Sequence, residues 1–357
     1  MNFSCFYFRE NWRTTDSSFL VLESGAYGHM LHPFEDDSLT FSQIKDIISK
    51  LFSGEIKIRE KVDGQQLSVS FKNDKVVFAR NKEHLRNFGE NALDVDSLSQ
   101  MFNGRGEVQN VFVKSARDLE SALLRKPKSI LSKWFGDGSK FLSLEIVYSS
   151  TVNVIPYQSN MLIPHSLIEY DENGNVVSSD DLMGKYIFDN INGDYFETFS
   201  KMILGNIEII NDLSDEFIRE VDRIKGDLHD DTTIKEYRRL KGSVEPIERL
   251  FRLLGITLIN NSENLLNSNK EDIVNDIRNR IEDKIREIEN SDNVDDVIKL
   301  KDQLNKFYSI GGADTINPSE GLVFDYNGKK YKLTGSFTYV NNILGIGKYR
   351  WDFLITI

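Results

Sequence analysis

The spacing of apolar residues divides the chain into a first part rich in expected strands and a later part rich in expected helices. The clearest helix is expected over residues 40–54, where one face carries Ile44, Ile47, Ile48 and Leu51. Thr40 and Gln43 form a capping-box pattern at its start, and Gly54 stands where a helix-ending glycine belongs.

Alternation of apolar and polar residues predicts several strands in residues 1–178. A half-buried strand is expected where every second residue is apolar, at Leu67, Val69 and Phe71. Asn73-Asp74 supplies a turn, and residues 76–80 form the expected return strand. Two further strands are expected at residues 141–148 and 161–170.

Residues 180–310 have a helical pattern instead. One helix is expected from Ser214, with Phe217, Val221 and Ile224 on its apolar face and Gly226 after its end. Ser268 and Glu271 open another, whose single stripe of isoleucines is expected to pack in a core: Ile273, Ile277, Ile281, Ile285 and Ile288. Strand character returns from Glu320 to Gly335.

Composition is ordinary for a soluble globular protein, with 39% hydrophobic and 28% charged residues among 357. We expect no membrane span and no signal peptide, and therefore a cytoplasmic protein. Cys5 is the only cysteine, which excludes an intrachain disulfide and a cysteine-based metal site. The net charge of −12 argues against a generally basic nucleic-acid-binding surface, but it leaves room for a local basic cleft.

The sharpest local signal is Glu60-Lys61-Val62-Asp63-Gly64. Lys61 ends an extended run just before a turn and a strand, so its side chain can point into a cleft. A nucleophilic lysine must be neutral, and its pKa must therefore be lowered by burial or by nearby cations. The alternative interpretation is a solvated lysine before a turn.

Further lysines for such a cluster stand in an expected hairpin at residues 320–333. A two-residue loop, Asn327-Gly328, would put Glu320 on the face opposite Lys330 and Lys332. A three-residue loop that includes Tyr326 would put all of them on one face, leaving Val323, Tyr331 and Leu333 on an apolar face. The second register segregates the side chains better and is the one expected, with a solvated hairpin as the alternative.

Taken in order, these motifs resemble the covalent nucleotidyltransferase superfamily, which comprises ATP-dependent DNA ligases, RNA ligases and mRNA-capping enzymes. The set is most similar to that of bacteriophage RNA ligases and related ligase-like proteins. The resemblance covers about residues 25–178 and 315–350 and rests on Glu60 to Gly64, Arg80, Leu144-Glu145-Ile146, Glu320 to Val323, and Lys330-Tyr331-Lys332.

The resemblance implies a role for each reactive side chain. Lys61 is the expected nucleophile, which forms a phosphoramide bond to AMP. Lys330 and Lys332 are expected to contact the α-phosphate and to stabilise charge as pyrophosphate leaves. Glu320 is expected to bind the divalent metal, Mg²⁺ or Mn²⁺, or to orient the lysine. These roles suit phosphoryl transfer, which depends mostly on positioning and charge neutralisation.

The resemblance also implies how ATP is held as a cofactor. Glu60 is expected beside the adenine, and Arg80 and Glu145 at the ribose or its flanking groups. Asp63 and Gly64 complete this expected cofactor-binding set.

The chain departs from the family pattern in three respects. The family places an aromatic ring on the adenine, but here Ile168 or Leu167 takes that place, or Tyr170 supplies the ring. The long helical block before Glu320 is unusual. The short stretch after Lys332 leaves no room for a C-terminal OB domain, which argues against the DNA-ligase and capping branches.

Two weaker signals have both a functional and a structural interpretation. His29 and His32 could be metal ligands, could line a substrate entrance with Tyr27, or could belong to a plain loop. The basic run of residues 80–86, with His84 and Arg86, could grip a 5′-phosphate or be a solvated loop.

We therefore expect an α+β fold, with an antiparallel-rich, ATP-grasp-like ligase adenylation core and a mainly helical insertion. Residues 1–179 and 313–357 are expected to form the adenylation domain and residues 180–312 the insertion, which would bind nucleic acid or a protein partner. The expected function is ATP-dependent RNA ligation, with RNA preferred over DNA and with 5′-phosphate and 3′-hydroxyl ends as substrates. If the chain is phage-encoded, the expected location is the host cytoplasm.

Two alternatives stay open. AMP could pass from Lys61 to a protein or another non-nucleic-acid acceptor, which the net acidity favours. The fold could also be kept without turnover, as a structural or binding protein.

Overall fold

The computed structural model describes residues 30–151, 154–267 and 270–347, which form two compact units. Unit 1 comprises Gly64–Thr151 and Ser159–Ile203. Unit 2 comprises Met30–Asp63, the described part of 152–158, and the described residues from Leu204 onward. Each unit has its own sheet and its own apolar core.

Unit 1 is built on a 6-stranded sheet with strand order β3-β2-β4-β5-β6 and with β7 paired parallel to β5. The other pairings are antiparallel. The strands are β2 (Gln65–Lys72), β3 (Lys75–Ala79), β4 (Lys140–Val147), β5 (Met161–Tyr170), β6 (Val176–Asp180) and β7 (Ser200–Lys201). The strands expected at 67–71, 76–80, 141–148 and 161–170 are thus confirmed to within one or two residues.

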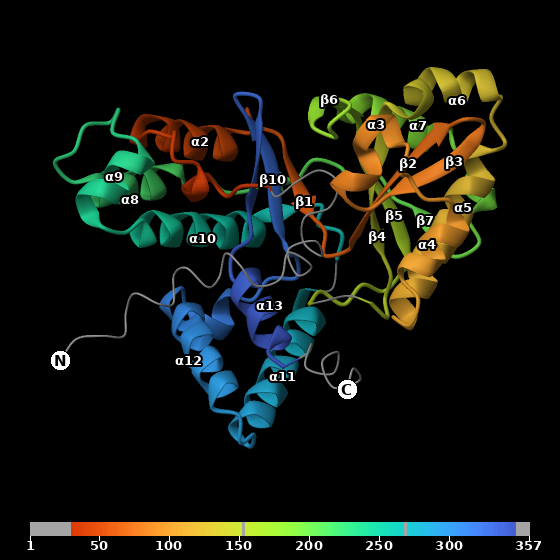
Figure 1. The fold of residues 1–357 in the computed structure, drawn as a ribbon. Helices are drawn as coiled ribbons and strands as arrows, with labels where there is room; N and C mark the ends of the chain where they lie inside the picture. Colours follow the sequence, from red (N-terminus) through yellow and green to blue (C-terminus); the bar gives the residue numbers. More distant parts are fainter. Residues whose placement is uncertain (1–29, 152–153, 268–269, 348–357) are drawn as a thin grey trace, which may run out of the picture. The chain divides into compact units, whose positions relative to one another are not determined.

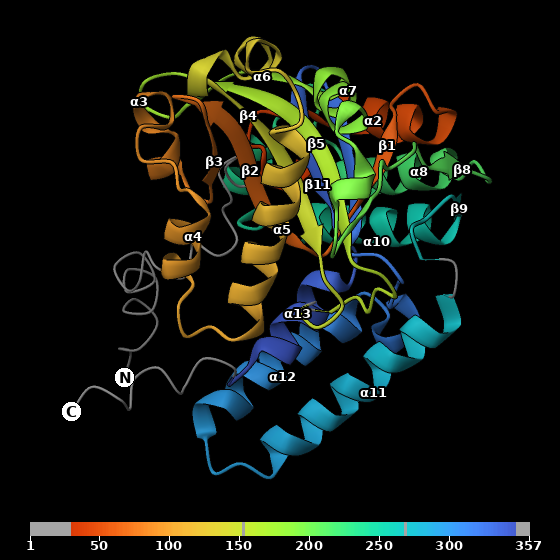
Figure 2. The ribbon, with the colours of Figure 1, turned by 90° about the vertical axis from the view of Figure 1, so that its right-hand side faces the viewer.

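Helices cover one face of this sheet. They are α4 (Val95–Met101), α5 (Glu107–Leu123), α6 (Lys128–Phe135) and α7 (Asp181–Asn190). The short α3 (Arg86–Gly89) is not among them, and its Gly89 lies close to Phe141, whose ring is on the other side of the sheet. Figure 2 shows α5 crossing the sheet, where Phe112 and Leu119 join the core that contains Leu67 and Leu144. The opposite face of the central strands is more polar and carries Ser68, Ser143 and Glu145.

Unit 2 combines a 3-stranded antiparallel sheet, in the order β1-β10-β11, with helices from distant parts of the chain (Figure 1). The strands of this sheet are β1 (Ile58–Lys61), β10 (Gly321–Tyr326) and β11 (Lys329–Leu333). A separate 2-stranded sheet pairs β8 (Glu208–Ile209) with β9 (Ser262–Glu263). Its helices are α2 (Phe41–Ser53), α8 (Ser214–Lys225), α9 (Ile234–Lys241), α10 (Glu245–Asn260), α11 (Lys270–Glu289), α12 (Val294–Ser309) and α13 (Phe337–Gly345).

The expected first helix is confirmed as α2. The Thr40 side chain accepts the Gln43 N–H, the Gln43 side chain caps in return, and Gly54 ends the helix in the left-handed region with φ of 75°. Ile44, Ile47, Ile48 and Leu51 are all buried in the core of unit 2. This helix was predictable because its boundary signals and its apolar stripe are both local.

The expected three-residue hairpin register was wrong. Asn327 and Gly328 form a two-residue loop, both with positive φ (49° and 78°), and Tyr326 pairs with Lys329. Such a turn matches the twist of the flanking strands. This register buries Leu322, Phe324, Tyr326, Tyr331 and Leu333 against the helices. Tyr331 and Leu333 are buried in either register, so the two registers differ along β10. The burial of Leu322, Phe324 and Tyr326 outweighs the burial of Val323 that the expected register offered, because buried area decides the balance.

The isoleucine stripe packs in a core, as expected. Ile273, Ile277, Ile281 and Ile288 of α11 are buried, and α13 packs against both α11 and α12. The predicted cap residue Ser268 lies outside the described residues. Among the helices in the described ranges, none has the length and apolar character that a membrane crossing would need.

The mixed α+β class and the antiparallel-rich sheets agree with the prediction. Residues 180–312 are mainly helical, but the compact units do not divide at those positions. Residues 180–203 belong to unit 1, whereas α8 and α10 share one core with α2 and β10 of unit 2. The helical block of unit 2 is therefore not packed as a separate insertion.

Asp36 joins the start of unit 2 to β11. It is 6% exposed and accepts hydrogen bonds from the Tyr331 hydroxyl (2.7 Å), Lys329 Nζ (2.9 Å) and the Ser38 hydroxyl (2.6 Å). Burial alone would raise the pKa of Asp36, but these hydrogen bonds hold it well below its ordinary value. The carboxylate therefore stabilises unit 2 most where it is ionised.

We expect Asp36→Asn to lower the free energy of unfolding by about 1.5–3 kcal/mol at pH 7, the range for hydrogen bonds to a charged group. Because the folded-state pKa is depressed, this stabilisation is present above the unfolded pKa of about 4 and is lost as pH falls below it. Urea denaturation at pH 7 and pH 3 measures the difference. Asp37→Asn, which removes an exposed ion pair with Arg238, is the control and should cost under about 1 kcal/mol. Equal losses for both variants at pH 7 would contradict this interpretation.

Candidate functional site

Lys61 is the last residue of β1, and its pairing places it at one end of the unit 2 sheet. It lies opposite Gly321, while Arg59 lies opposite Val323. Successive side chains of a strand point to opposite faces, so Lys61 and Arg59 share a face and the buried Glu60 and Ile58 point to the other. The strand therefore points Lys61 away from the apolar core of unit 2.

Lys330 and Lys332 lie on the Lys61 face of the same sheet. Lys332 is paired with Val323 and Lys330 with Asp325, and both lysines are half-buried. We call this set of Arg59, Lys61, Lys330 and Lys332 the cationic strand face. It contains the three lysines that the sequence singled out, although through the other hairpin register.

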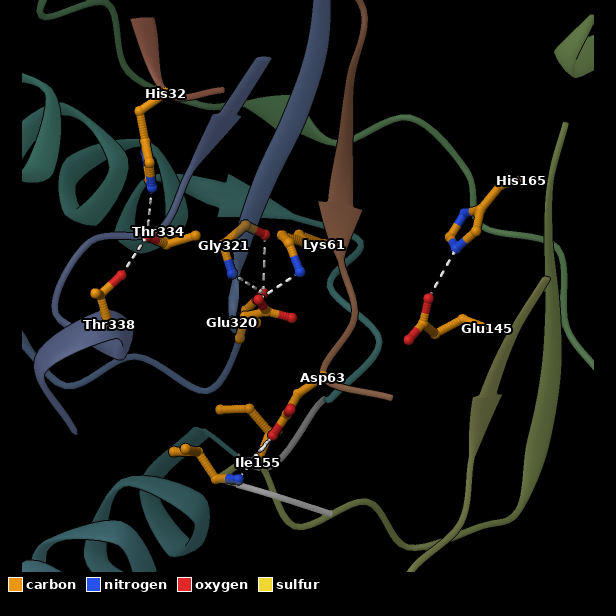
Figure 3. Close-up of polar contacts among 12 residues, drawn as sticks. His32, Lys61, Asp63, Glu145, Ile155, His165, Glu320, Gly321, Thr334 and Thr338 are labelled. Carbon is orange, nitrogen blue, oxygen red and sulfur yellow. Dashed lines mark hydrogen bonds and ion pairs between the residues drawn. The ribbon is translucent and has the colours of Figure 1, made fainter. Parts of the chain in front are cut away.

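Glu320 forms an ion pair with Lys61, with Glu320 Oε1 as the acceptor (Figure 3). The side chains are only 28% and 12% exposed, for Lys61 and Glu320 respectively. Strict alternation along β10 would have pointed Glu320 away from Lys61. Glu320 instead precedes the strand, in a bend, and this frees its side chain to turn toward the lysine. The predicted partnership of these two residues is thus present.

Gly321 lies between Lys61 and the end of β11 and leaves no room for a side chain. An added Cβ would lie 2.2 Å from the carbonyl oxygen of Leu333 and 3.0 Å from the Cα of Thr334. The close approach of β10 to β11 at this end therefore requires glycine.

Glu60 lies on the opposite face of β1 and is 4% exposed. Its Oε2 accepts the backbone N–H of Leu266 at 2.6 Å. Within the part of the chain that the structure describes, its Oε1 is buried with no hydrogen-bond partner. Burial raises the pKa of Glu60, and the Leu266 N–H opposes that shift. In unit 2, Glu60 thus contacts the segment after α10 and points away from the Lys61 face.

Asp63 holds a loop of residues 154–157 in unit 2. Its Oδ2 accepts the N–H groups of Val154 (2.7 Å) and Ile155 (2.9 Å), and its own N–H donates to the Tyr157 hydroxyl (2.9 Å), as Figure 3 shows for Ile155. Burial, and then the charges of Asp63 and Glu60, raise the pKa of the Tyr157 hydroxyl well above its ordinary value. The structure therefore gives Asp63 a clamping role next to the nucleophile candidate.

Gly64 and Glu145 come together within unit 1. A Cβ on Gly64 would lie 2.6 Å from Glu145 Cγ, so the glycine makes room for that side chain. Glu145 Oε2 lies 3.1 Å from His165 Nε2 (Figure 3). A register shift between β4 and β5 skips His165, since Ser143 pairs with Ser166 and Leu144 with Pro164. Bulges of this kind re-aim a side chain.

Arg80 is buried in unit 1 just after β3. Its guanidinium donates to the carbonyl of Gln66 and lies 4.6 Å from the ring centroid of Phe112. Burial lowers the pKa of Arg80 to about 10, and the charge of Glu145 opposes that shift. Burial, and then the charge of Arg80, lower the pKa of His84. His84 Nδ1 accepts the backbone N–H of Arg80.

The three candidates for an adenine platform differ in their packing in unit 1. Ile168 and Tyr170 lie with Phe141 in a small cluster on one side of the sheet. Leu167 points to the other side, into the helix-covered core. All three are buried, and the packing gives Leu167 a structural role.

Of the weaker candidates, Tyr27 and His29 lie outside the described residues. His32 is buried, stacked on Phe34 at 4.8 Å, and close to Thr334 (Figure 3). The basic run contains a short 3-10 helix, Lys82–Leu85, and ends at Arg86, the first residue of α3, which pairs with Glu83. Within residues 30–151, 154–267 and 270–347, no group of three or more His, Cys, Asp or Glu side chains is suited to a metal ion.

Sequence reasoning missed three residues that the structure ties to the candidates. Arg59 shares the Lys61 face, and the period of two along β1 was a signal that could have found it. His165 contacts Glu145, and Tyr157 contacts Asp63. Both contacts join residues that are far apart in the sequence, so no local pattern could indicate them.

Comparison of the chain with family models, with curated proteins and with solved structures gives no match in any of the three.

We expect Glu60→Gln to raise the free energy of unfolding at pH 7 by about 1 kcal/mol, the scale of a buried polar group's penalty. Because burial raises the folded-state pKa of Glu60, the protonated form is favoured on folding. The native state is therefore destabilised as pH rises above that pKa, and the neutral amide relieves this. Thermal unfolding from pH 4 to pH 8 should show a gain that grows with pH. Glu55→Gln, at an exposed carboxylate, should show none. A Glu60→Gln gain independent of pH would rule out this cause.

We expect Gly321→Ala to cost about 1–3 kcal/mol, because the new methyl group must push β11 away from β10. Chemical denaturation measures the loss. Gly205→Ala is the matched control in unit 2, since a Cβ there meets nothing within 4 Å. If both variants are equally stable, the close approach at Gly321 is not required.

Proposed function

We propose that the protein is an ATP-dependent polynucleotide ligase that forms a covalent lysyl-AMP at Lys61, with RNA as its preferred substrate. The observation that carries the proposal is the cationic strand face, where Lys61 contacts Glu320 and shares its face with Lys330 and Lys332. The resemblance of the same residues to the motifs of covalent nucleotidyltransferases supports it. A ligase-type adenylation core is part of the proposal.

In the first step Lys61 loses a proton, and its Nζ then attacks the α-phosphorus of ATP. A nitrogen–phosphorus bond forms, the bond from the α-phosphorus to the bridging oxygen breaks, and pyrophosphate leaves. Glu320 accepts the proton, which its contact with Lys61 supports. Lys330 and Lys332 neutralise the charge that develops on the phosphate oxygens.

A divalent metal suits this site. Mg²⁺ in nucleotide sites is held by one or two carboxylates together with substrate phosphates. Glu320, which contacts Lys61, is the carboxylate that fits this role, and the metal would supply further charge neutralisation.

In the later steps the AMP moves from Lys61 to a 5′-phosphate, and the amine of Lys61 is restored. A 3′-hydroxyl then attacks the activated 5′-phosphate, a phosphodiester bond forms, and AMP leaves. The resemblance implies a nucleoside-binding role for Arg80, Glu145 and Ile168 of unit 1.

A second candidate acceptor is a protein side chain, which the net charge of −12 favours because an acidic chain repels polyanions. This candidate keeps the Lys61 step unchanged. It differs only in the group that receives AMP.

We expect incubation with α-labelled ATP and Mg²⁺ to leave label on the protein after denaturation. Lys61→Ala should abolish it, and Lys330→Ala or Lys332→Ala should slow labelling by about 100-fold or more, the loss seen when one charge-stabilising group is removed. Lys75→Ala, at an exposed lysine of unit 1, is the control and should label normally. Absence of label with ATP, GTP or NAD would refute the proposal and favour a non-catalytic binding protein.

Adding a 5′-phosphorylated RNA or DNA to the labelled protein identifies the acceptor. A ligase should discharge the label and yield joined or circular product, with RNA used faster than DNA. Label that moves to a protein instead would favour the second candidate.

A further inference from the structure

Arg59 lies on the cationic strand face but has no role in the reaction described above. It is two residues before Lys61 on β1, so the two Cα atoms are about 7 Å apart along the strand. Its pairing partner in β10 is Val323, and Val323 pairs in turn with Lys332 of β11. Arg59 and Lys332 therefore flank the same valine from the two outer strands.

Arginine at position 59 has chemical properties that a lysine there would not have. Arg59 is half-buried, and a guanidinium stays protonated at any physiological pH, so it cannot act as nucleophile or base. Its planar fork suits two-point contact with phosphate oxygens, whereas a lysine binds phosphate as a point charge. Its cross-strand neighbour in β10 is the uncharged residue Val323.

The proposed step requires a further positive group, beside the leaving pyrophosphate. Lys61 must be neutral when it attacks, so it contributes no positive charge at that moment. Lys330 and Lys332 are engaged with the α-phosphate in the proposed function. The leaving pyrophosphate develops its charge farther along the triphosphate, and stabilising a leaving group accelerates the step in which it departs.

We propose that Arg59 binds the β- and γ-phosphates of ATP and so holds the pyrophosphate leaving group. This inference rests on the proposed function, because it assigns the α-phosphate to the end of the face at which Lys61 lies. The triphosphate then runs along β1 from Lys61 toward Arg59. Arg59 acts in lysyl-AMP formation and in its reversal by pyrophosphate, but not in the transfer of AMP to an acceptor.

The test begins with inorganic pyrophosphate and Mg²⁺ as the probe, added to the full chain and followed by calorimetry. Arg59→Ala should weaken pyrophosphate binding by about tenfold or more, the loss expected for a charge-assisted hydrogen bond. Arg59→Lys should recover part of the affinity. Lys57→Ala removes an exposed cation two residues earlier and should stay within about twofold, as expected for a charge that makes no direct contact.

The second measurement separates the steps of the reaction. Arg59→Ala should slow labelling by ATP and its reversal by pyrophosphate by about tenfold or more, while protein already carrying AMP transfers it to a 5′-phosphorylated RNA at close to the wild-type rate. A thermal melt of each variant checks folding, and Arg59→Lys serves if Arg59→Ala is unfolded.

The outcomes distinguish this inference from the proposed function. If Arg59→Ala and Lys57→Ala bind pyrophosphate equally well, or if AMP transfer falls as much as labelling, the role of Arg59 is overturned. Failure of the wild-type chain to bind pyrophosphate overturns it as well. If pyrophosphate binding depends on Arg59 but Lys61 is never labelled, Arg59 is supported as a polyphosphate-binding residue and the proposed reaction is overturned.

Discussion

The antiparallel pairing of β10 with β1 on one side and β11 on the other is the constraint on which the candidate site depends. Because the side-chain period of a strand is two, a slip of one residue would turn Lys330 and Lys332 into the apolar core. The left-handed Asn327-Gly328 turn fixes the register at one end. At the other end Gly321 fixes the register, because it has no side chain and can lie close to the backbone of Leu333.

Burial on the other face of the sheet reinforces the same register. Leu322, Phe324 and Tyr331 pack with α2 and α10 in one core, so the free energy gained there holds the lysines on the outer face. The site thus takes its geometry from contacts that involve none of its reactive groups. Electrostatic repulsion among the cations is tolerated because a large apolar contact holds the strands together.

The short motif around Lys61 divides into one reactive group and its supports. Glu60 accepts the Leu266 N–H on the far face of β1, and Asp63 clamps the loop that holds Tyr157. Gly64 makes room for Glu145 within unit 1. A sequence pattern that looks like a single catalytic signature therefore also includes positions that packing requires.

The sequence was informative where the signals are local. The cap residues and apolar stripe of α2, the alternation in β2 and the isoleucines of α11 predicted those elements to within a few residues. The hairpin register was predicted wrongly, because both registers give a plausible alternation and only the packing of three-dimensional neighbours decides between them. The contact of His165 with Glu145 was also missed, because it depends on how β4 and β5 pair and no local pattern indicates it.

A cluster of cations within a chain of net charge −12 has a consequence for how a polyanion reaches it. At long range the whole chain repels such a ligand, whereas at contact the cationic strand face attracts it. Ionic strength acts on these two terms differently, since screening removes the distant repulsion at concentrations where the Debye length, about 10 Å at 0.1 M, still exceeds a contact distance. Added salt therefore first eases the approach of a polyanion and only later weakens its attachment.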